Sequence, residues 1–187
     1  MAHMGLKYLA WAKIKEEPAN AEPTYDGGKE IGKIVSLNVA ISNSEGKLYA
    51  NDQLAEYASE FAEGDLTAET DNISLEDQAA MLGATYSEQD GYVGAAGDTA
   101  PYGGVGGYQV LMVGGKKKYR AWVYPKVKAM QPNVDATTKG DSVSFGTQPI
   151  KMKVSATNKG TWIYQKEFDA EAEAKSYVNS KLGMSET

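Results

Sequence analysis

One stretch constrains the fold of this chain more than any other, because residues 101–131 predict a single long β-hairpin. Tyr108 to Val113 mixes aromatic, β-branched and long apolar residues, which strands favour. Gly114 and Gly115 predict the turn, since glycine adopts positive φ without steric cost. Two strands alone are only marginally stable in water, so the rest of the chain must supply more sheet.

The return strand, Lys118 to Ala129, alternates two kinds of side chain, and the alternation predicts its two faces. One set is mostly small and apolar and suits a core: Tyr119, Ala121, Val123, Val127 and Ala129. The other set is aromatic and cationic and suits a surface or a partner: Arg120, Trp122, Tyr124, Lys126 and Lys128.

Further strands and two short helices are expected on either side of this hairpin. Alternating or β-branched runs predict strands over Gly5–Ile14, Glu30–Ser42, most of Leu54–Glu69, Asp141–Ala156 and Thr161–Phe168. Helices are predicted over Ser74–Leu82, with Ser74 as N-cap, and from a cap at Asp169 to Leu182. The pattern predicts a mainly β fold, a β-sandwich or barrel with one or two short helices at its margin.

The 187 residues are most simply one domain, over residues 5–183. Residues 1–4 are interpreted as a cloning scar outside the fold, and residues 184–187 as a tail. Two extended loops are expected, at 15–29 and 43–53, because these ranges gather prolines, glycines, acids and the turn sequence Asn43-Ser-Glu-Gly46. Both loops are expected to be mobile in the monomer and ordered in an assembly.

The supply of reactive residues argues against catalysis. Cysteine is absent and the single histidine, His3, lies within residues 1–4, so neither a hydrolase triad nor a zinc site can be built from the predicted domain. Gly103 to Gly107 lacks the phosphate-loop spacing and leads into a strand, which favours a strand bend. Many acids are present, but no spacing selects a glycosidase pair. We therefore expect no enzyme and no catalytic, metal or cofactor residues.

Charge is distributed unevenly along the chain. Residues 1–100 hold 6 Lys and Arg against 18 Asp and Glu, a net charge of −12, whereas residues 101–187 hold 13 against 7, a net charge of +6. Two solvated surfaces and complementary patches for head-to-tail self-association both explain this split. The acidic total argues against tight nucleic-acid binding, and no apolar run approaches the ~20 residues that span a bilayer.

Several segments, taken in order, cover nearly the whole chain and together look familiar: Gly5–Tyr8, Lys47–Glu56, Ala100–Tyr108, Lys118–Trp122, Tyr124–Lys128, Thr138–Ser142, Lys166–Ala174 and Lys181–Gly183. This ordered set resembles the major tail proteins of long-tailed phages and prophages of Gram-positive bacteria. The resemblance implies a tail-tube subunit, a β-sandwich that forms hexameric rings stacked around a channel for DNA. It further implies synthesis in the host cytoplasm, a place in the virion tail, and contact with tape-measure, tail-terminator and distal tail proteins.

The segment that resembles the family's arm supplies the candidate residues of an oligomer interface. Tyr49 and Leu54 are expected to be its apolar anchors. The other candidates come from the same segment or from the first predicted loop: Leu48, Asn51, Asp52, Tyr57, Tyr25 and Asp26. DNA is expected only transiently in the lumen, and no cofactor or membrane is expected.

Two alternatives remain open from the sequence. One is an inner-tube protein of a contractile injection system, a related class of assembly. The other is a β-sandwich module that binds a carbohydrate or a receptor, with Trp122, Tyr124 and Trp162 as an exposed aromatic platform.

Overall fold

The predicted hairpin forms the middle of one large antiparallel sheet in the computed structural model, which describes residues 2–50, 53–131 and 147–185. Strand β7 (Tyr102–Val113) pairs with β8 (Lys116–Met130) from Tyr102 opposite Lys128 to Val113 opposite Lys116. Gly114 and Gly115 make the turn with φ of 58° and 79°, as the sequence predicts. The hairpin prediction is confirmed.

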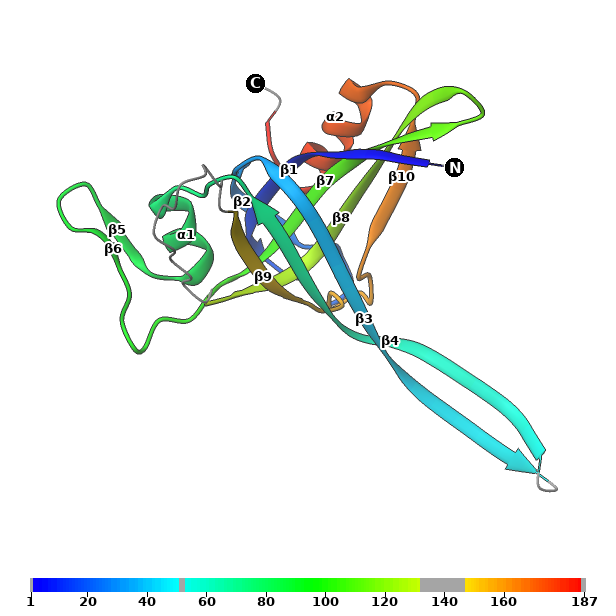
Figure 1. The fold of residues 1–187 in the computed structure, drawn as a ribbon. Coiled ribbons are helices and arrows are strands. Elements are labelled where there is room, and N and C mark those ends of the chain that lie inside the picture. The colour runs from blue at the N-terminus through cyan, green and yellow to red at the C-terminus, as the bar shows by residue number, and fades with distance from the viewer. Residues whose placement is uncertain (1, 51–52, 132–146, 186–187) are drawn as a thin grey trace, which may run out of the picture.

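The sheet has eight strands (Figure 1). Seven of them follow the order β2-β1-β7-β8-β9-β4-β3, and the eighth, β10, pairs with β8. Their bounds are β1 Ala2–Glu16, β2 Thr24–Glu30, β3 Ile34–Ala50, β4 Gln53–Thr70, β9 Gln148–Val154 and β10 Tyr164–Phe168. The remaining elements are the small hairpin of β5 (Thr85–Ser87) and β6 (Gly91–Val93) and the helices α1 (Leu75–Leu82) and α2 (Glu171–Lys181). The mainly β prediction with two short helices is confirmed.

Strand β8 has two halves that pair with different neighbours. Tyr119 to Val123 pairs with β10, whereas Val127 to Met130 pairs with β9. Opposite β7, the register slips in the same region, since Val105 faces Tyr124 but Gly103 faces Val127. This irregularity lies at Pro125, which has no N–H to donate to the ladder.

Both faces of β8 are buried, so the sequence-based assignment of an outer face is wrong. Trp122 and Tyr124 are 4% and 6% exposed and belong to a core shared with β1, β4 and β9. Ala121 and Val123, on the opposite face, pack against α2. The predicted alternation holds only as far as Tyr124, because the register shift at Pro125 places Val127 and Ala129 in the same core as Trp122 and Tyr124. The alternation also could not reveal that α2 covers one face while the curled sheet and α1 enclose the other.

The glycines of β7 allow this double packing. The sequence favoured a strand bend at Gly103 to Gly107, whereas the structure shows that these glycines let neighbouring side chains and backbone approach β7 closely. A Cβ on Gly106 would lie 2.9 Å from side-chain atoms of both Val123 and Val178. A Cβ on Gly107 would lie 2.3 Å from the Tyr8 carbonyl oxygen and 2.7 Å from the Trp122 ring. Side chains there would push α2 and Trp122 away from the sheet.

Most of the two expected loops is strand. Residues 15–16 belong to β1 and residues 24–29 to β2, so only residues 17–23 connect them. Asn43 to Gly46 continues β3, paired with residues 58–61 of β4. Their turn-forming residues are tolerated because β2 and β3 are edge strands that need not pack on both sides. Residues 51–52 of the second loop lie outside the described residues.

Two boundary predictions also need correction. Helix α1 has the predicted cap, since the Ser74 hydroxyl accepts a hydrogen bond from the Asp77 N–H. Helix α2 instead begins after Ala170 without a side-chain cap, and Asp169 pairs with Lys118 at 2.9 Å, because β10 places it beside the start of β8. Strand β1 begins at Ala2, so residues 2–4 extend it along β7 instead of lying outside the fold.

The double burial of β8 predicts that Trp122→Ala is destabilising. Removing this buried ring should cost about 3–5 kcal/mol of unfolding free energy. Lys117→Ala, at an exposed position near the start of the same strand, is the matched control and should change stability by about 0.5 kcal/mol or less. Chemical denaturation followed by circular dichroism measures both values. Equal stability of the two variants would contradict the burial of the aromatic face.

Candidate assembly surface

The outer part of the β3–β4 hairpin leaves the sheet and projects far from the body of the molecule (Figure 1). Strand β9 pairs with β4 only from Gly64 to Thr70. Beyond Gly64, β4 pairs with β3 alone, as far as Ala50 opposite Gln53. We call this two-stranded part, residues 41–50 and 53–63, the arm.

The arm hides neither of its faces within the monomer. Residues 41–47 and 56–60 are all exposed, including Ile41 at 39% and Tyr57 at 53%. At its base the arm packs against the body, where the Phe61 ring stacks on the Trp162 ring with centroids 4.5 Å apart. An isolated two-stranded hairpin gains little stability from itself, so the arm is a surface that lacks a second layer.

The arm is acidic and has two distinct faces. Its described residues carry four glutamates, Glu45, Glu56, Glu60 and Glu63, and one lysine, Lys47. On one face the Tyr57 hydroxyl donates a hydrogen bond to Glu45, and the Lys47 ammonium lies over the Tyr57 ring. The other face is defined by two cross-strand pairs, Ser44 with Glu60 and Gly46 with Ala58, and by Glu56. We call this second face the acidic face.

The structure brings four of the eight predicted interface residues onto the arm. Leu48 and Tyr49 lie in β3, and Leu54 and Tyr57 lie in β4, with Tyr49 opposite Leu54 and Lys47 opposite Tyr57. Asn51 and Asp52, the next two candidates, lie outside the described residues. The backbone register therefore places the two expected apolar anchors, Tyr49 and Leu54, opposite each other.

The last two predicted residues, Tyr25 and Asp26, lie on β2, at the opposite end of the strand order from β3. Asp26 is exposed and accepts a hydrogen bond from the Gly27 N–H. Tyr25 is half-buried and donates its hydroxyl hydrogen to the Pro125 carbonyl at 2.7 Å. The structure does not bring these two residues together with the arm of the same chain.

The connection over residues 17–23 is held by polar contacts to β8 and to the β9–β10 loop. The Glu17 carboxylate pairs with Lys126 at 2.8 Å and accepts a hydrogen bond from the Asn158 N–H. Glu22 pairs with Lys159 at 2.9 Å. The Glu17–Lys126 pair is largely shielded from water, with side chains 17% and 15% exposed, so this connection has an anchor within the monomer.

Helix α2 is fixed on the sheet at both ends by polar side chains. Near its start, Glu171 pairs with Lys7 at 2.9 Å and accepts a hydrogen bond from the Tyr108 hydroxyl. Hydrogen bonds from Lys7 and Tyr108 hold the pKa of Glu171 below its ordinary value. Near its end, Asn179 accepts a hydrogen bond from the Tyr8 hydroxyl at 2.6 Å. Tyr8 adopts φ of 62°, an uncommon conformation for a non-glycine residue, at a bulge in β1.

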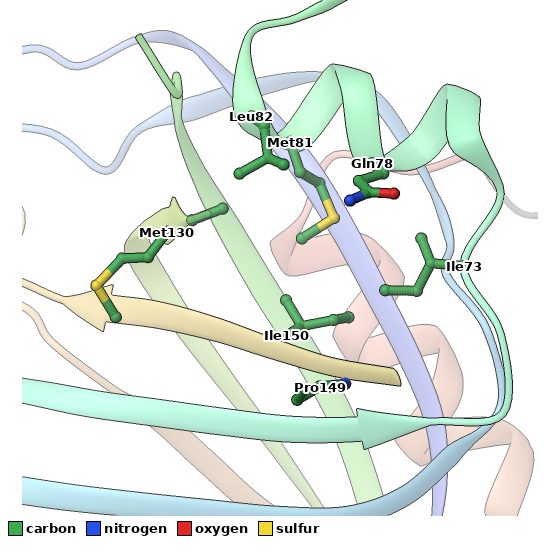
Figure 2. Close-up of a pocket in the computed structure, with 8 residues that line it drawn as sticks. Ile73, Gln78, Met81, Leu82, Met130, Pro149 and Ile150 are labelled. Atoms are coloured by element: carbon green, nitrogen blue, oxygen red, sulfur yellow. The ribbon is translucent and has the colours of Figure 1, made fainter. Parts of the chain in front are cut away.

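A small pocket lies beside helix α1. Figure 2 shows a pocket between α1 and the ends of β8 and β9, but it holds only about 20 Å³. Its lining is almost entirely apolar, with Met81, Leu82 and Ile150 around the single polar side chain Gln78. Among the described residues, no three His, Cys, Asp or Glu side chains gather in a group that could hold a metal ion. No helix in the described ranges is both long and apolar enough to cross a membrane.

The aromatic platform expected for a binding module does not exist. Trp122 and Tyr124 are buried in the core. Trp162 is half-buried and stacks on Phe61, at the base of the arm. These three rings therefore do not form an exposed surface for a sugar or a receptor.

Sequence reasoning missed the arm as a continuous hairpin and missed the acidic face that it presents. Glycine, asparagine and serine at residues 43–46 suggested a turn too early. The sequence did hold a signal for a long hairpin. Asn51 and Asp52 are residues typical of turns, and the two stretches that flank them have nearly equal length. A sequence search against protein-family models and against curated proteins found no match to this chain.

The Glu171 contacts predict a pH-dependent contribution to stability. A carboxyl whose pKa is lower in the folded chain stabilises the fold above its unfolded pKa of about 4.3 and loses that contribution as pH falls through the folded value. Glu171→Gln should therefore lower the melting temperature at pH 7, by the equivalent of about 1 kcal/mol or less because the pair is exposed. The two proteins should converge once the pH falls below the lowered pKa of Glu171 in the folded chain. A difference that persists unchanged at acid pH would contradict this role.

Proposed function

We propose that this chain is a structural subunit of a phage tail tube. In this proposal, copies assemble into rings, hexameric as in the family that the sequence resembles, and the rings stack around a channel through which DNA passes. Its place is the virion tail, and its partners are further copies of itself together with tape-measure, terminator and distal tail proteins. Two independent features support the proposal, the ordered sequence segments and the arm.

The arm is the observation that carries the proposal. Residues 41–47 and 56–60 are all exposed, yet the two strands stay paired as far as Ala50 opposite Gln53, with register shifts between Ser42 and Asn43 and between Leu48 and Tyr49. A catalytic protein has no evident use for such a projection, whereas a self-assembling subunit uses it to reach a neighbour. Packing a face of the arm against another copy would supply the layer that the arm lacks.

The positions of the candidate residues also favour a head-to-tail contact. The arm belongs to the β3–β4 edge, whereas Tyr25 and Asp26 lie on the β2 edge at the other end of the sheet. Contacts between two different surfaces of one chain are heterologous, and they close into rings when the rotation between copies allows it. The acidic first half and basic second half of the sequence favour the same arrangement.

Removing the arm tests the proposed function directly. In the test variant, residues 44–60 are replaced by Asn-Gly, so that Asn43 and Phe61, which face each other across the hairpin, are joined by a tight turn. We expect wild-type protein to form rings or tubes in negative-stain micrographs and to sediment as large particles. The shortened variant should remain monomeric with an unchanged circular dichroism melt, because none of the described side chains among the deleted residues belongs to either core.

The matched control is Ser59→Ala, which keeps the arm and removes one exposed hydroxyl. It should assemble like the wild type. Wild-type protein that stays monomeric at high concentration would contradict the proposed function, and an armless variant that forms normal rings would contradict the role of the arm.

A further inference from the structure

A shallow groove runs along the exposed side of α2, between the helix and β10. Its floor is aromatic, since the Phe168 and Tyr177 rings lie against each other with centroids 5.4 Å apart. Small residues of the helix, Ala172 and Ser180, are exposed along its side. We call this surface the α2 groove.

Lys166 lies over the aromatic floor of the α2 groove, and Lys181 lies near the Tyr177 end of that floor. The Lys166 ammonium lies 5.1 Å from the Phe168 ring centre and 5.9 Å from that of Tyr177. The Lys181 ammonium lies 4.1 Å from the Tyr164 ring centre and 5.8 Å from that of Tyr177. Within the described part of the chain, neither lysine forms an ion pair with a carboxylate.

Three neighbouring cations are already paired within the chain. Arg120 pairs with Glu167 at 2.6 Å, Lys118 pairs with Asp169, and Lys7 pairs with Glu171. One acid, Glu173, also lines the α2 groove. An extended acidic segment with small side chains can therefore lie on the rings and reach both ammonium groups.

The acidic face of the arm has these properties. Glu56 and Glu60 are exposed, and neither forms an ion pair in the described ranges. They are four residues apart on one strand, a spacing of about 13 Å, so each can reach a different lysine. Between them lies Ala58, opposite Gly46, and these small residues allow the arm's backbone to approach an aromatic floor closely.

We propose that the α2 groove receives the acidic face of the arm from a second copy of this chain. The inference rests on the proposed function, because it requires self-association, and it names the receiving surface. Glu56 and Glu60 pair with Lys166 and Lys181, while Ala58 and Gly46 pack over Tyr177 and Phe168. The contact is heterologous, so each copy offers one arm and one groove.

Disulfide trapping tests this contact, and the chain favours the method because it has no cysteine of its own. Ala58→Cys is placed on the acidic face of one sample, and Ala172→Cys is placed in the α2 groove of another. The two are mixed at a concentration at which wild-type protein assembles, oxidised mildly, and examined on a non-reducing gel, with mass spectrometry of the linked peptides. The matched control replaces Ala58→Cys by Ser59→Cys, the adjacent residue on the opposite face of the same strand.

We expect a 58–172 disulfide between chains and at least a fivefold lower yield with the control at residue 59. Sedimentation of the same samples, measured before oxidation, distinguishes a wrong receiving surface from a wrong proposed function. Assembly without the 58–172 link, or with equal links from residues 58 and 59, overturns the α2 groove as the receiving surface and leaves the proposed function standing. Absence of assembly in wild-type samples overturns both.

A charge exchange provides the second measurement. Lys166→Glu with Lys181→Glu should weaken association about three- to tenfold, and so should Glu56→Lys with Glu60→Lys. Mixing the two double variants should restore association through the inverted pairs. Lys117→Glu, an exposed lysine outside the α2 groove, is the control and should have little effect. Failure of the mixture to recover, with all variants folded, would show that these charges do not meet.

Discussion

The structure depends on one close contact, the passage of the glycine-bearing strand β7 between two layers of side chains. On one face Val178 of α2 sits over Gly106, and on the other the Trp122 ring sits over Gly107, each within the space that a Cβ would occupy. Since β7 and β8 are thereby buried on both faces, they form a rigid centre. Every other strand of the large sheet is added outward from this centre, and the edges β2, β3 and β10 remain for other contacts.

This arrangement separates the molecule into a body and a projection. The body buries its apolar side chains in two cores, one under α2 and one enclosed by the curled sheet. The arm contributes Phe61, at its base, to one of these cores, and no other described side chain of the arm belongs to either core. Its exposure is therefore a property of the fold, because β9 ends opposite Gly64 and offers no third strand beyond that point. This division fits a subunit whose arm packs against a neighbouring copy better than it fits a protein that acts as a monomer.

The sequence predicted those elements whose signals are local and failed where burial depends on distant segments. The β7–β8 turn at Gly114 and Gly115 and the Ser74 cap were predicted correctly, because turn and cap chemistry is set by a few adjacent residues. Trp122 was placed on an outer face, because its cover comes from distant parts of the chain. The arm was interrupted at residues 43–46, because an exposed edge strand accepts the same polar residues as a turn. Of the eight interface candidates, the arm gathers Leu48, Tyr49, Leu54 and Tyr57.

Hydrogen–deuterium exchange of the arm as a function of protein concentration tests the central claim most directly. If another copy completes the arm, amides of residues 41–50 and 53–63 should exchange quickly in dilute monomer and become protected as assembly proceeds. Amides of β7 and β8 should remain protected throughout, because both faces of these strands are already buried. Strong arm protection that is the same at all concentrations, in a protein that stays monomeric, would contradict the account.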